Sequence, residues 1–339
     1  MSAFDFDCEI KETPYLVKGL IPYNSLSFII GRPGFGKSFF SEQLAISVLT
    51  GQPFMGHEVQ KGNVLLIDQD TAGDVVPQRL KMFMNYYDDN IVHNRGLLYA
   101  EIQRDYRLKD DSLLNAINKV NQEANISLVV IDSLIKVAMG LNMNDISDMS
   151  VLSRLRKCLN DKLAIVMVHH TGKAVKLSPE DIMTCSDPSV LFIGSTAISG
   201  EADGYFAVTS PDAGKQKFDR LWVRPVTKRF RLDQESFVAK FEQSDTMYHI
   251  DFDSLYDSEG SLSTIEQDIV TLFEQSSKIR TANEVHLDMG NTHGINAVRE
   301  ALHSLEAKQV LICHREAHNM FRYELINKVK NKIMEVKTQ

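Results

Sequence analysis

Apolar and polar blocks alternate along residues 16–240 in a way that predicts strands and helices in turn. Four short apolar runs are typical of strands buried on both faces of a parallel sheet: 25–30, 63–68, 127–132 and 164–170. Amphipathic stretches between the runs, such as 39–49 and 148–159, predict helices. This alternation predicts an α/β fold with a doubly wound, mainly parallel sheet and helices on both faces.

Later apolar runs predict further strands, which we expect to be antiparallel and added at one end of the sheet. They lie at 206–210, 221–226, 237–242 and 247–252.

The pattern changes beyond residue 250. A polar stretch at 251–263, rich in Asp, Ser and Gly, predicts a linker between a domain at 1–250 and a second at 264–339. The second domain carries three helical stretches and then two short strand candidates, at 264–275, 279–288, 292–308, 309–314 and 320–326. Three helices followed by a β-hairpin are the outline of a winged helix. We therefore predict a small α+β winged-helix-like domain.

Composition and charge narrow the classes of function. The chain has 339 residues, of which 43% are hydrophobic and 24% charged, as in an ordinary globular protein large enough for two domains. A net charge of −8 argues against a protein that coats itself in nucleic acid. No apolar run reaches the length of a membrane span, and the acidic segment 1–12 lacks the features of a signal peptide. Four scattered cysteines fit reduced thiols, so we expect a cytoplasmic protein with no membrane contact.

The segment GRPGFGKS at 31–38 follows a predicted strand and opens a predicted helix. Its glycines permit backbone conformations in which successive N–H groups point at phosphate oxygens. We expect Lys37 to neutralise the β- and γ-phosphates and the Ser38 hydroxyl to ligate Mg²⁺. The segment predicts an ATP site formed by Gly31, Arg32, Pro33, Gly34, Phe35, Gly36, Lys37, Ser38 and Phe39.

A phosphate-binding loop of this kind also needs an acid at a strand end. Asp132 ends the run 127–132, which is the Walker B arrangement, and we expect its carboxylate to hold Mg²⁺ partly through water. His169 and His170 end another run, where an imidazole can donate a hydrogen bond to the γ-phosphate.

Taken together, these segments resemble the RecA-like ATPases of the RepA plasmid helicase family, which is related to the DnaB-type replicative helicases. The resemblance covers roughly residues 15–245 and rests on GRPGFGKS, LLIDQDTAGDVVPQRL, LVVIDSL, VMVHHTGK and FIGSTAISGEADGYFAV. It implies a homo-oligomeric, hexameric ring that binds ATP and Mg²⁺ between subunits. It also implies single-stranded DNA in a central channel.

The resemblance implies roles for single residues. Asp70 stands where the family has a catalytic glutamate, and Asp68 is the alternative. Arg79 resembles the arginine that stacks on adenine, although a plain surface arginine is nearly as favoured. His170 is implied to sense the γ-phosphate and report hydrolysis to the DNA-binding loops.

Ring ATPases complete each site with a basic residue from the neighbouring subunit. The candidates are Arg224, Lys228 and Arg229, for which a basic strand edge is the competing interpretation. Two loops, 138–149 and 173–193, could face a channel, but neither is strongly basic or aromatic. The DNA-binding candidates are Lys173, Lys176, Asn296, Arg299 and Arg315.

The first functional hypothesis is therefore an ATP-driven motor acting on DNA, such as a replicative helicase of a plasmid, phage or other mobile element. Its C-terminal domain would bind DNA or a replication or regulatory protein. The second hypothesis is an ATP-dependent DNA-binding regulator or loader that switches assembly state without unwinding. The acidic charge and weakly basic loops favour the second hypothesis, and the resemblance favours the first.

Overall fold

A computed structural model shows the chain as two compact units, Met1–Tyr256 and Asp257–Gln339. The structure describes residues 13–171, 177–185, 188–192, 194, 196–211, 219–228, 234–256, 264–276, 278–290, 292–307, 310–316 and 320–326.

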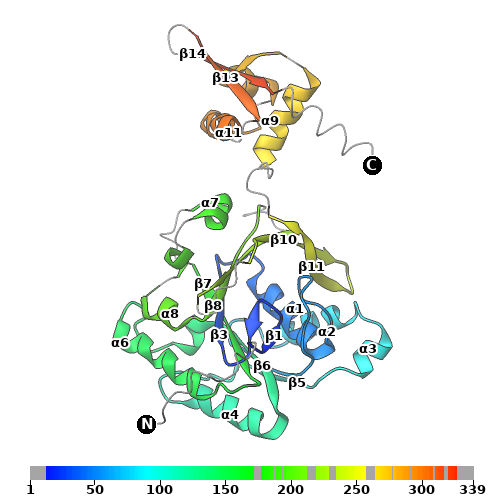
Figure 1. The fold of residues 1–339 in the computed structure, drawn as a ribbon, viewed down its shortest axis with the longest axis vertical. Helices are drawn as coiled ribbons and strands as arrows, with labels where there is room; N and C mark the ends of the chain where they lie inside the picture. Colours follow the sequence, from blue (N-terminus) through cyan, green and yellow to red (C-terminus); the bar gives the residue numbers. More distant parts are fainter. Residues whose placement is uncertain are drawn as a thin grey trace, which may run out of the picture. The chain divides into compact units, whose positions relative to one another are not determined.

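A nine-stranded sheet forms the centre of the larger unit, in the order β11-β10-β9-β8-β3-β7-β6-β4-β5 (Figure 1). Its parallel part consists of β8 (Gly204–Thr209), β3 (Leu26–Gly31), β7 (Ala164–His170), β6 (Ile126–Asp132), β4 (Asn63–Asp68) and β5 (Leu98–Ile102). The antiparallel extension consists of β9 (Arg220–Thr227), β10 (Phe237–Gln243) and β11 (Tyr248–Leu255). Two short strands, β1 (Tyr15–Val17) and β2 (Ile21–Pro22), pair separately.

Helices cover both faces of the sheet, as the alternating pattern predicts (Figure 1). One face carries α1 (Lys37–Thr50) and α2 (Val75–Met84), with the short α3 (Asp89–His93) beyond them. The other carries α4 (Ser112–Ala124), α5 (Leu134–Val137), α6 (Ile146–Met149), the 3-10 segment η1 (Ser150–Lys157) and α8 (Thr196–Glu201). The segment between β7 and α8 contains α7 (Pro179–Thr184) and η2 (Pro188–Leu191).

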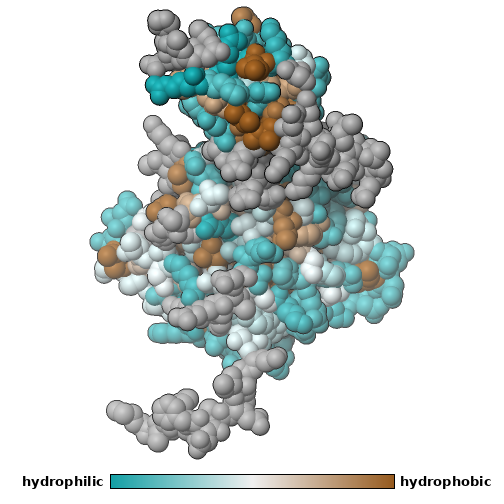
Figure 2. All heavy atoms as spheres, turned by 45° about the horizontal axis from the view of Figure 1, so that its top comes forward, coloured by the Kyte–Doolittle hydropathy of each residue, from teal (hydrophilic) through white to brown (hydrophobic). Residues whose placement is uncertain are grey.

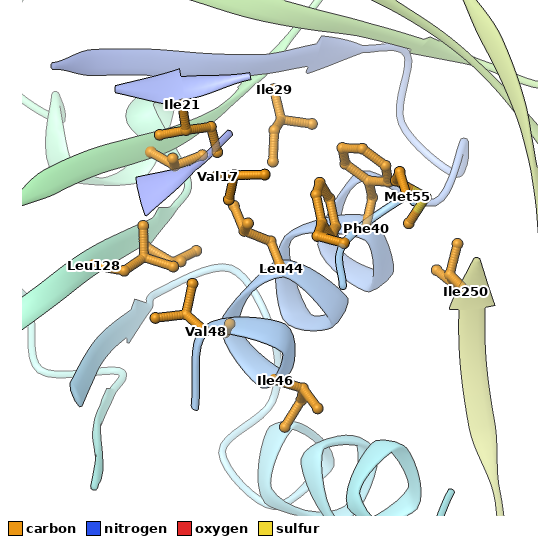
Figure 3. Close-up of a cluster of buried hydrophobic side chains, with 14 of the residues drawn as sticks. Val17, Ile21, Ile29, Phe40, Leu44, Ile46, Val48, Met55, Leu128 and Ile250 are labelled. Carbon is orange, nitrogen blue, oxygen red and sulfur yellow. The ribbon is translucent and has the colours of Figure 1, made fainter. Parts of the chain in front are cut away.

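Successive residues of the central strands serve two different cores. Along β6, Leu128 and Val130 pack in the cluster that includes α1, whereas Val129 and Ile131 pack in the cluster that includes α4. Figure 3 shows Leu44 and Val48 projecting from α1 into the first cluster, near Leu128. Because side chains alternate across a strand, a strand covered on both faces needs apolar residues at every position. This explains why the strands appear in the sequence as unbroken apolar runs.

Three predicted features are wrong. The stretch 148–159 is mostly the 3-10 segment η1, in which the hydroxyls of Ser150 and Ser153 bond to the carbonyls of Ser147 and Ser150 and compete with α-helical bonding. The first late strand, β8, runs parallel to β3, because α8 carries the chain back across the sheet before it. Residues 251–255 belong to β11, where they pair with β10, so they are not linker.

In the part of the smaller unit that the structure describes, three helices accompany a three-stranded antiparallel sheet in the order β12-β14-β13. Its elements are α9 (Thr264–Gln275), β12 (Arg280–Thr281), α10 (Ala282–Asp288), α11 (Ile295–Ala307), β13 (Leu311–Glu316) and β14 (Met320–Leu325). Phe273, Val298, Leu302 and Tyr323 are among the buried residues of its own core. The helices and the hairpin therefore follow one another in the predicted order.

The surface in Figure 2 is mostly hydrophilic, with apolar side chains in small groups. Among the described residues, no helix is long and apolar enough to cross a membrane. Cys158, Cys185 and Cys313 are free thiols, and Cys8 lies outside the described residues.

We expect Leu128→Ala to lower the free energy of unfolding of the larger unit by about 2–5 kcal/mol, because Leu128 is fully buried against α1. The single tryptophan of the chain, Trp222, is buried in β9, so its fluorescence during urea unfolding reports on this unit. Leu97→Ala is the control: this leucine is 60% exposed, and the change should stay within about 0.5 kcal/mol. Equal losses for the two variants would contradict the packing described for β6.

Candidate active site

The loop between β3 and α1 has a backbone that its glycines make possible. Gly34 and Gly36 have φ values of 82° and 75°, in the left-handed region that favours glycine. A Cβ at Gly31 would lie 2.3 Å from the carbonyl oxygen of Val208 on the neighbouring strand β8. The loop therefore turns tightly out of the sheet and delivers the N-terminus of the 14-residue helix α1, with its positive dipole end, to the sheet edge.

Lys37 and Ser38 occupy the first turn of α1. The Nζ of Lys37, a residue only 4% exposed, donates a hydrogen bond of 2.8 Å to the carbonyl of Arg32, which closes the loop on itself. Burial lowers the pKa of Lys37 to about 8, although the nearby carboxylates of Asp132 and Asp70 act in the opposite direction. The Ser38 hydroxyl donates to Oδ2 of Asp132 at 2.6 Å.

Asp132 comes from the end of β6, which is separated from β3 by β7 alone. The parallel strands thus place an aspartate and a serine hydroxyl side by side although they lie 94 residues apart. Burial, and after it the Asp68 carboxylate, raises the pKa of Asp132 to about 6, while the hydrogen bond from Ser38 opposes the shift. The site therefore holds a carboxylate whose charge is poorly compensated by the chain itself.

Oxygen donors of this kind fit Mg²⁺, which binds one or two carboxylates or hydroxyls together with substrate phosphates. Among the described residues, no group of three or more His, Cys, Asp or Glu side chains could hold a metal alone. The donor set is consistent with a metal that arrives with its phosphate ligands.

Two acids, one at the end of β4 and one just after it, have different surroundings. Asp68 is buried, and its Oδ1 accepts hydrogen bonds from the backbone N–H groups of Asp70 and Thr71, at 2.9 and 2.8 Å. The Asp70 side chain is 36% exposed, and its two oxygens face two cations or potential cations. Oδ1 lies 3.2 Å from Nζ of Lys136, and Oδ2 lies 3.7 Å from Nε2 of His170. Asp70 rather than Asp68 therefore has a carboxylate that water can reach.

His170 ends β7, the neighbour of β3 in the sheet. The phosphate-binding loop at 31–38, called the P-loop below, follows β3. Burial, followed by the Lys37 ammonium, lowers the pKa of His170, so its imidazole is neutral at neutral pH. The N–H of Thr171, the next residue, donates to the carbonyl of Gly31 at 3.0 Å. The end of β7 is thus hydrogen-bonded directly to the start of the P-loop.

Comparison with known proteins places the chain in a family. A family described as the AAA domain matches residues 1–175, more than half of the chain. The chain belongs to the AAA domain family. Its P-loop, the strand-end aspartate and the mainly parallel sheet make the larger unit a RecA-like P-loop ATPase domain.

Similarity to solved structures is more distant. A KaiC-like protein from the hyperthermophilic archaeon Pyrococcus horikoshii OT3 is 14% identical, with a TM-score of 0.44 over 71% of this chain and 94% of the other. A comparison with curated protein sequences gave no match.

The sequence did not predict two members of this AAA domain site. Lys136 lies in α5, one turn after Asp132, and no motif draws attention to it. Glu42 lies one helical turn after Ser38 and is 2% exposed. A glutamate at a position where the helix faces the sheet was the only available signal, since carboxylates are rarely buried without a partner.

The partner of Glu42 is Arg79, whose Nη2 lies 2.6 Å from Oε1 of Glu42. The guanidinium also lies over the ring of Phe39, 5.2 Å from its centroid. The predicted contact of Arg79 with adenine stays a prediction.

The candidates for subunit and DNA contacts are spread over the surface. Arg224 donates to the carbonyls of Ile182 and Cys185 at the end of α7, and Lys228 donates to the carbonyl of Ser199. In the smaller unit, Asn296 and Arg299 are exposed on α11, and Arg315 of β13 lies over the ring of Phe321. Three further candidates lie outside the described residues: Lys173, Lys176 and Arg229.

We expect Asp132→Asn to stabilise the metal-free protein at neutral pH by roughly 2–3 kcal/mol, because burial raises the pKa of Asp132 from 3.8 to about 6. The sign follows from proton binding. Between about pH 4 and pH 6 the folded carboxyl holds a proton that the unfolded one has lost, so wild-type stability falls as pH rises through this range. An uncharged Asn does not show this loss.

The measurement is urea unfolding followed by Trp222 fluorescence in EDTA, from pH 4 to pH 8. The stabilisation should be absent near pH 4 and complete above pH 6. Asp161→Asn, at an exposed turn, is the matched control and should change little at any pH. A gain for Asp132→Asn that did not depend on pH would contradict the assignment.

Proposed function

We propose that this chain is an ATP-hydrolysing motor that acts on DNA, a hexameric replicative helicase of a plasmid, phage or other mobile element. The observation that carries the hydrolytic part is the hydrogen bond between Ser38 and Asp132, with Asp70 held nearby between Lys136 and His170. Together with Lys37, this set supplies a phosphate-binding lysine, a metal-binding pair and a solvent-accessible base.

In the proposed reaction, Asp70 accepts a proton from the attacking water as its oxygen bonds to the γ-phosphorus. The bond from that phosphorus to the β,γ-bridging oxygen breaks, and ADP leaves. Lys37 and the N–H groups of the loop stabilise negative charge on the phosphates. Mg²⁺, held by the Ser38 hydroxyl and through water by Asp132, would neutralise further charge on the phosphate oxygens when bound.

Lys136 and His170 give the proposed base its position. The Lys136 ammonium lies 3.2 Å from Oδ1 of Asp70, and this ion pair holds the carboxylate in place. The neutral imidazole can donate to the γ-phosphate, as the resemblance to the RepA family implies. Because Thr171 bonds to Gly31, a change at His170 also reaches the P-loop and the segment after β7.

The DNA-directed part rests on the smaller unit. Its helix order and β13–β14 hairpin support a winged-helix-type module, with α11 as the helix that enters a DNA groove. Asn296 and Arg299 are exposed on this helix and can reach bases or phosphates. The same module could instead dock a replication or regulatory protein. Arg224 and Lys228 are the described candidates for a residue that completes a neighbouring subunit's site.

A regulator or loader that switches assembly state without unwinding is the second candidate. The observation in its favour is charge: the chain carries −8, and the loops 138–149 and 173–193 contribute few basic side chains. Both candidates use the same ATP site, so hydrolysis alone does not separate them.

ATP turnover with and without single-stranded DNA, alongside unwinding of a forked duplex, tests the proposal. A helicase should show DNA-stimulated turnover and unwind the fork. Lys37→Ala should lower turnover by on the order of 10²–10³-fold or more, because the lysine charge at the phosphates is lost. DNA-independent turnover without unwinding would favour the regulator, and turnover retained in Lys37→Ala would remove the site assignment itself.

We further expect Asp70→Asn to lower kcat by on the order of 10²–10⁴-fold with ATP affinity within a few-fold of wild type, since an amide does not accept the proton. Asp74→Asn, an exposed acid of the same loop, is the matched control. Near-normal kcat for Asp70→Asn, with the loss appearing in Asp68→Asn alone, would transfer the role of base to Asp68.

A further inference from the structure

A buried cluster of charges lies directly behind the proposed catalytic residues. Glu42 belongs to α1 and lies four residues after Ser38, so both side chains lie on nearly the same face of the helix. Asp68 ends β4, and Arg79 comes from α2. The side chains of Glu42, Asp68 and Arg79 are 2%, 2% and 14% exposed, so the three segments meet around charges that solvent barely reaches.

Arg79 is the hub of this cluster. Its Nη2 lies 2.6 Å from Oε1 of Glu42, 3.4 Å from the Thr71 hydroxyl and 3.9 Å from Oδ2 of Asp68. Its guanidinium face covers the ring of Phe39, the residue next to Ser38. One side chain therefore contacts α1 at two places, the end of β4 at a third and the β4–α2 loop at a fourth.

Asp68 links Arg79 to the backbone of Asp70, the proposed catalytic base. While its Oδ2 faces Arg79, its Oδ1 accepts the backbone N–H groups of Asp70 and Thr71. Two hydrogen bonds from consecutive residues to one oxygen fix the backbone of the loop just where Asp70 leaves it. A continuous path thus runs from α1 through Arg79 and Asp68 to the Cα of Asp70.

Stability alone does not account for this pair. In the described structure, Oε2 of Glu42 and Nε of Arg79 are buried without a hydrogen-bond partner, so the contact is not the two-bond pairing that arginine usually makes with a carboxylate. A buried carboxyl–guanidinium contact with unmet hydrogen bonds is often no more stable than an apolar replacement. The arrangement is instead suited to fixing the distance between two segments.

We propose that Arg79 is a positioning residue that, through Asp68, holds the loop carrying Asp70 at a fixed distance from the P-loop helix. The inference rests on the proposed hydrolytic function, in which Asp70 must meet a water molecule at the phosphate bound by α1. It assigns Arg79 a role in the rate of the chemical step rather than in recognition of the adenine ring of ATP. Errors of about 1 Å in such positioning can cost on the order of 100-fold in rate.

The test measures kcat and KM for ATP and for GTP in the full-length protein. Arg79→Met should lower kcat by on the order of 100-fold, leave KM for ATP within about threefold and keep the wild-type ratio of ATP to GTP use. Lys81→Met, an exposed lysine two residues further along α2, is the matched control and should behave as wild type. A normal kcat with a raised KM and a lost preference for ATP would show that Arg79 contacts the adenine ring, and would overturn the proposal.

A double variant tests the path through Asp68. If Arg79 acts through Asp68, Arg79→Met added to Asp68→Asn should lower kcat little beyond Asp68→Asn alone. Losses that multiply would show two independent effects and would overturn the path. Should Arg79→Met fail to fold by Trp222 fluorescence, Arg79→Lys replaces it in both experiments, because lysine keeps the charge and loses the planar fork that contacts three groups at once.

Failure of this inference can be told from failure of the proposed function. The hydrolytic function would be refuted if the wild-type protein showed no ATP turnover, or only turnover that Lys37→Ala leaves unchanged. Normal turnover in Arg79→Met, beside a Lys37→Ala variant that is inactive, would refute the positioning role alone.

Discussion

The hydrogen bond from Ser38 to Asp132 joins the first turn of α1 to the end of β6, and the other features of the site are arranged around it. It requires β3 and β6 to be parallel, with β7 between them, so that the P-loop and the strand-end aspartate emerge at the same edge. It also requires α1 to start at Lys37, which the left-handed conformation of Gly36 allows. The doubly wound sheet is the framework that meets both conditions.

Burying several ionisable side chains at one edge of the sheet carries a desolvation cost. Lys37 and Arg79 lie where their charges partly offset that cost. Burial is the largest cause of the raised pKa values of Glu42 and Asp132, and neighbouring carboxylates add to it. The Arg79 guanidinium opposes the shift at Glu42, and the Lys37 ammonium opposes it at Asp132. Burial raises the pKa of Glu42 to about 8 even with Arg79 beside it. A bound cation and phosphate contacts would offset this cost. The raised pKa values are consistent with a site shaped for function rather than for stability.

The proposed function assigns different tasks to the two units. In the larger one, the groups proposed for phosphate binding and water activation lie at the ends of β3, β4, β6 and β7. The smaller one has its own core, and it exposes Arg299 on α11 and Arg315 on β13. Hydrolysis in one unit and recognition in the other would be a coherent pairing in a DNA-directed motor. Because the chain as a whole is acidic, DNA binding would need basic side chains gathered on one part of the surface.

The amino-acid sequence alone determined the class of fold and the centre of the site. The strands at 63–68 and 164–170 were predicted to the residue, because a strand buried on both faces must be apolar throughout. The P-loop could be predicted for a similar reason, since its glycines, lysine and serine are required within eight consecutive positions. The 3-10 geometry of η1, the parallel direction of β8 and the true end of the last strand were missed, because they depend on competing hydrogen bonds and on neighbouring strands.

Only the tertiary structure decided which charged residues work together. Glu42 and Lys136 carry no motif, and for Arg79 the family resemblance implies a contact with adenine rather than one with Glu42 or Asp68. Their importance arises because α1, the β4–α2 loop and α5 converge at one edge of the sheet, where low solvent exposure forces each charge to find a partner. Sequence patterns encode local geometry, whereas contacts between segments that are far apart are settled only when the sheet has brought them together.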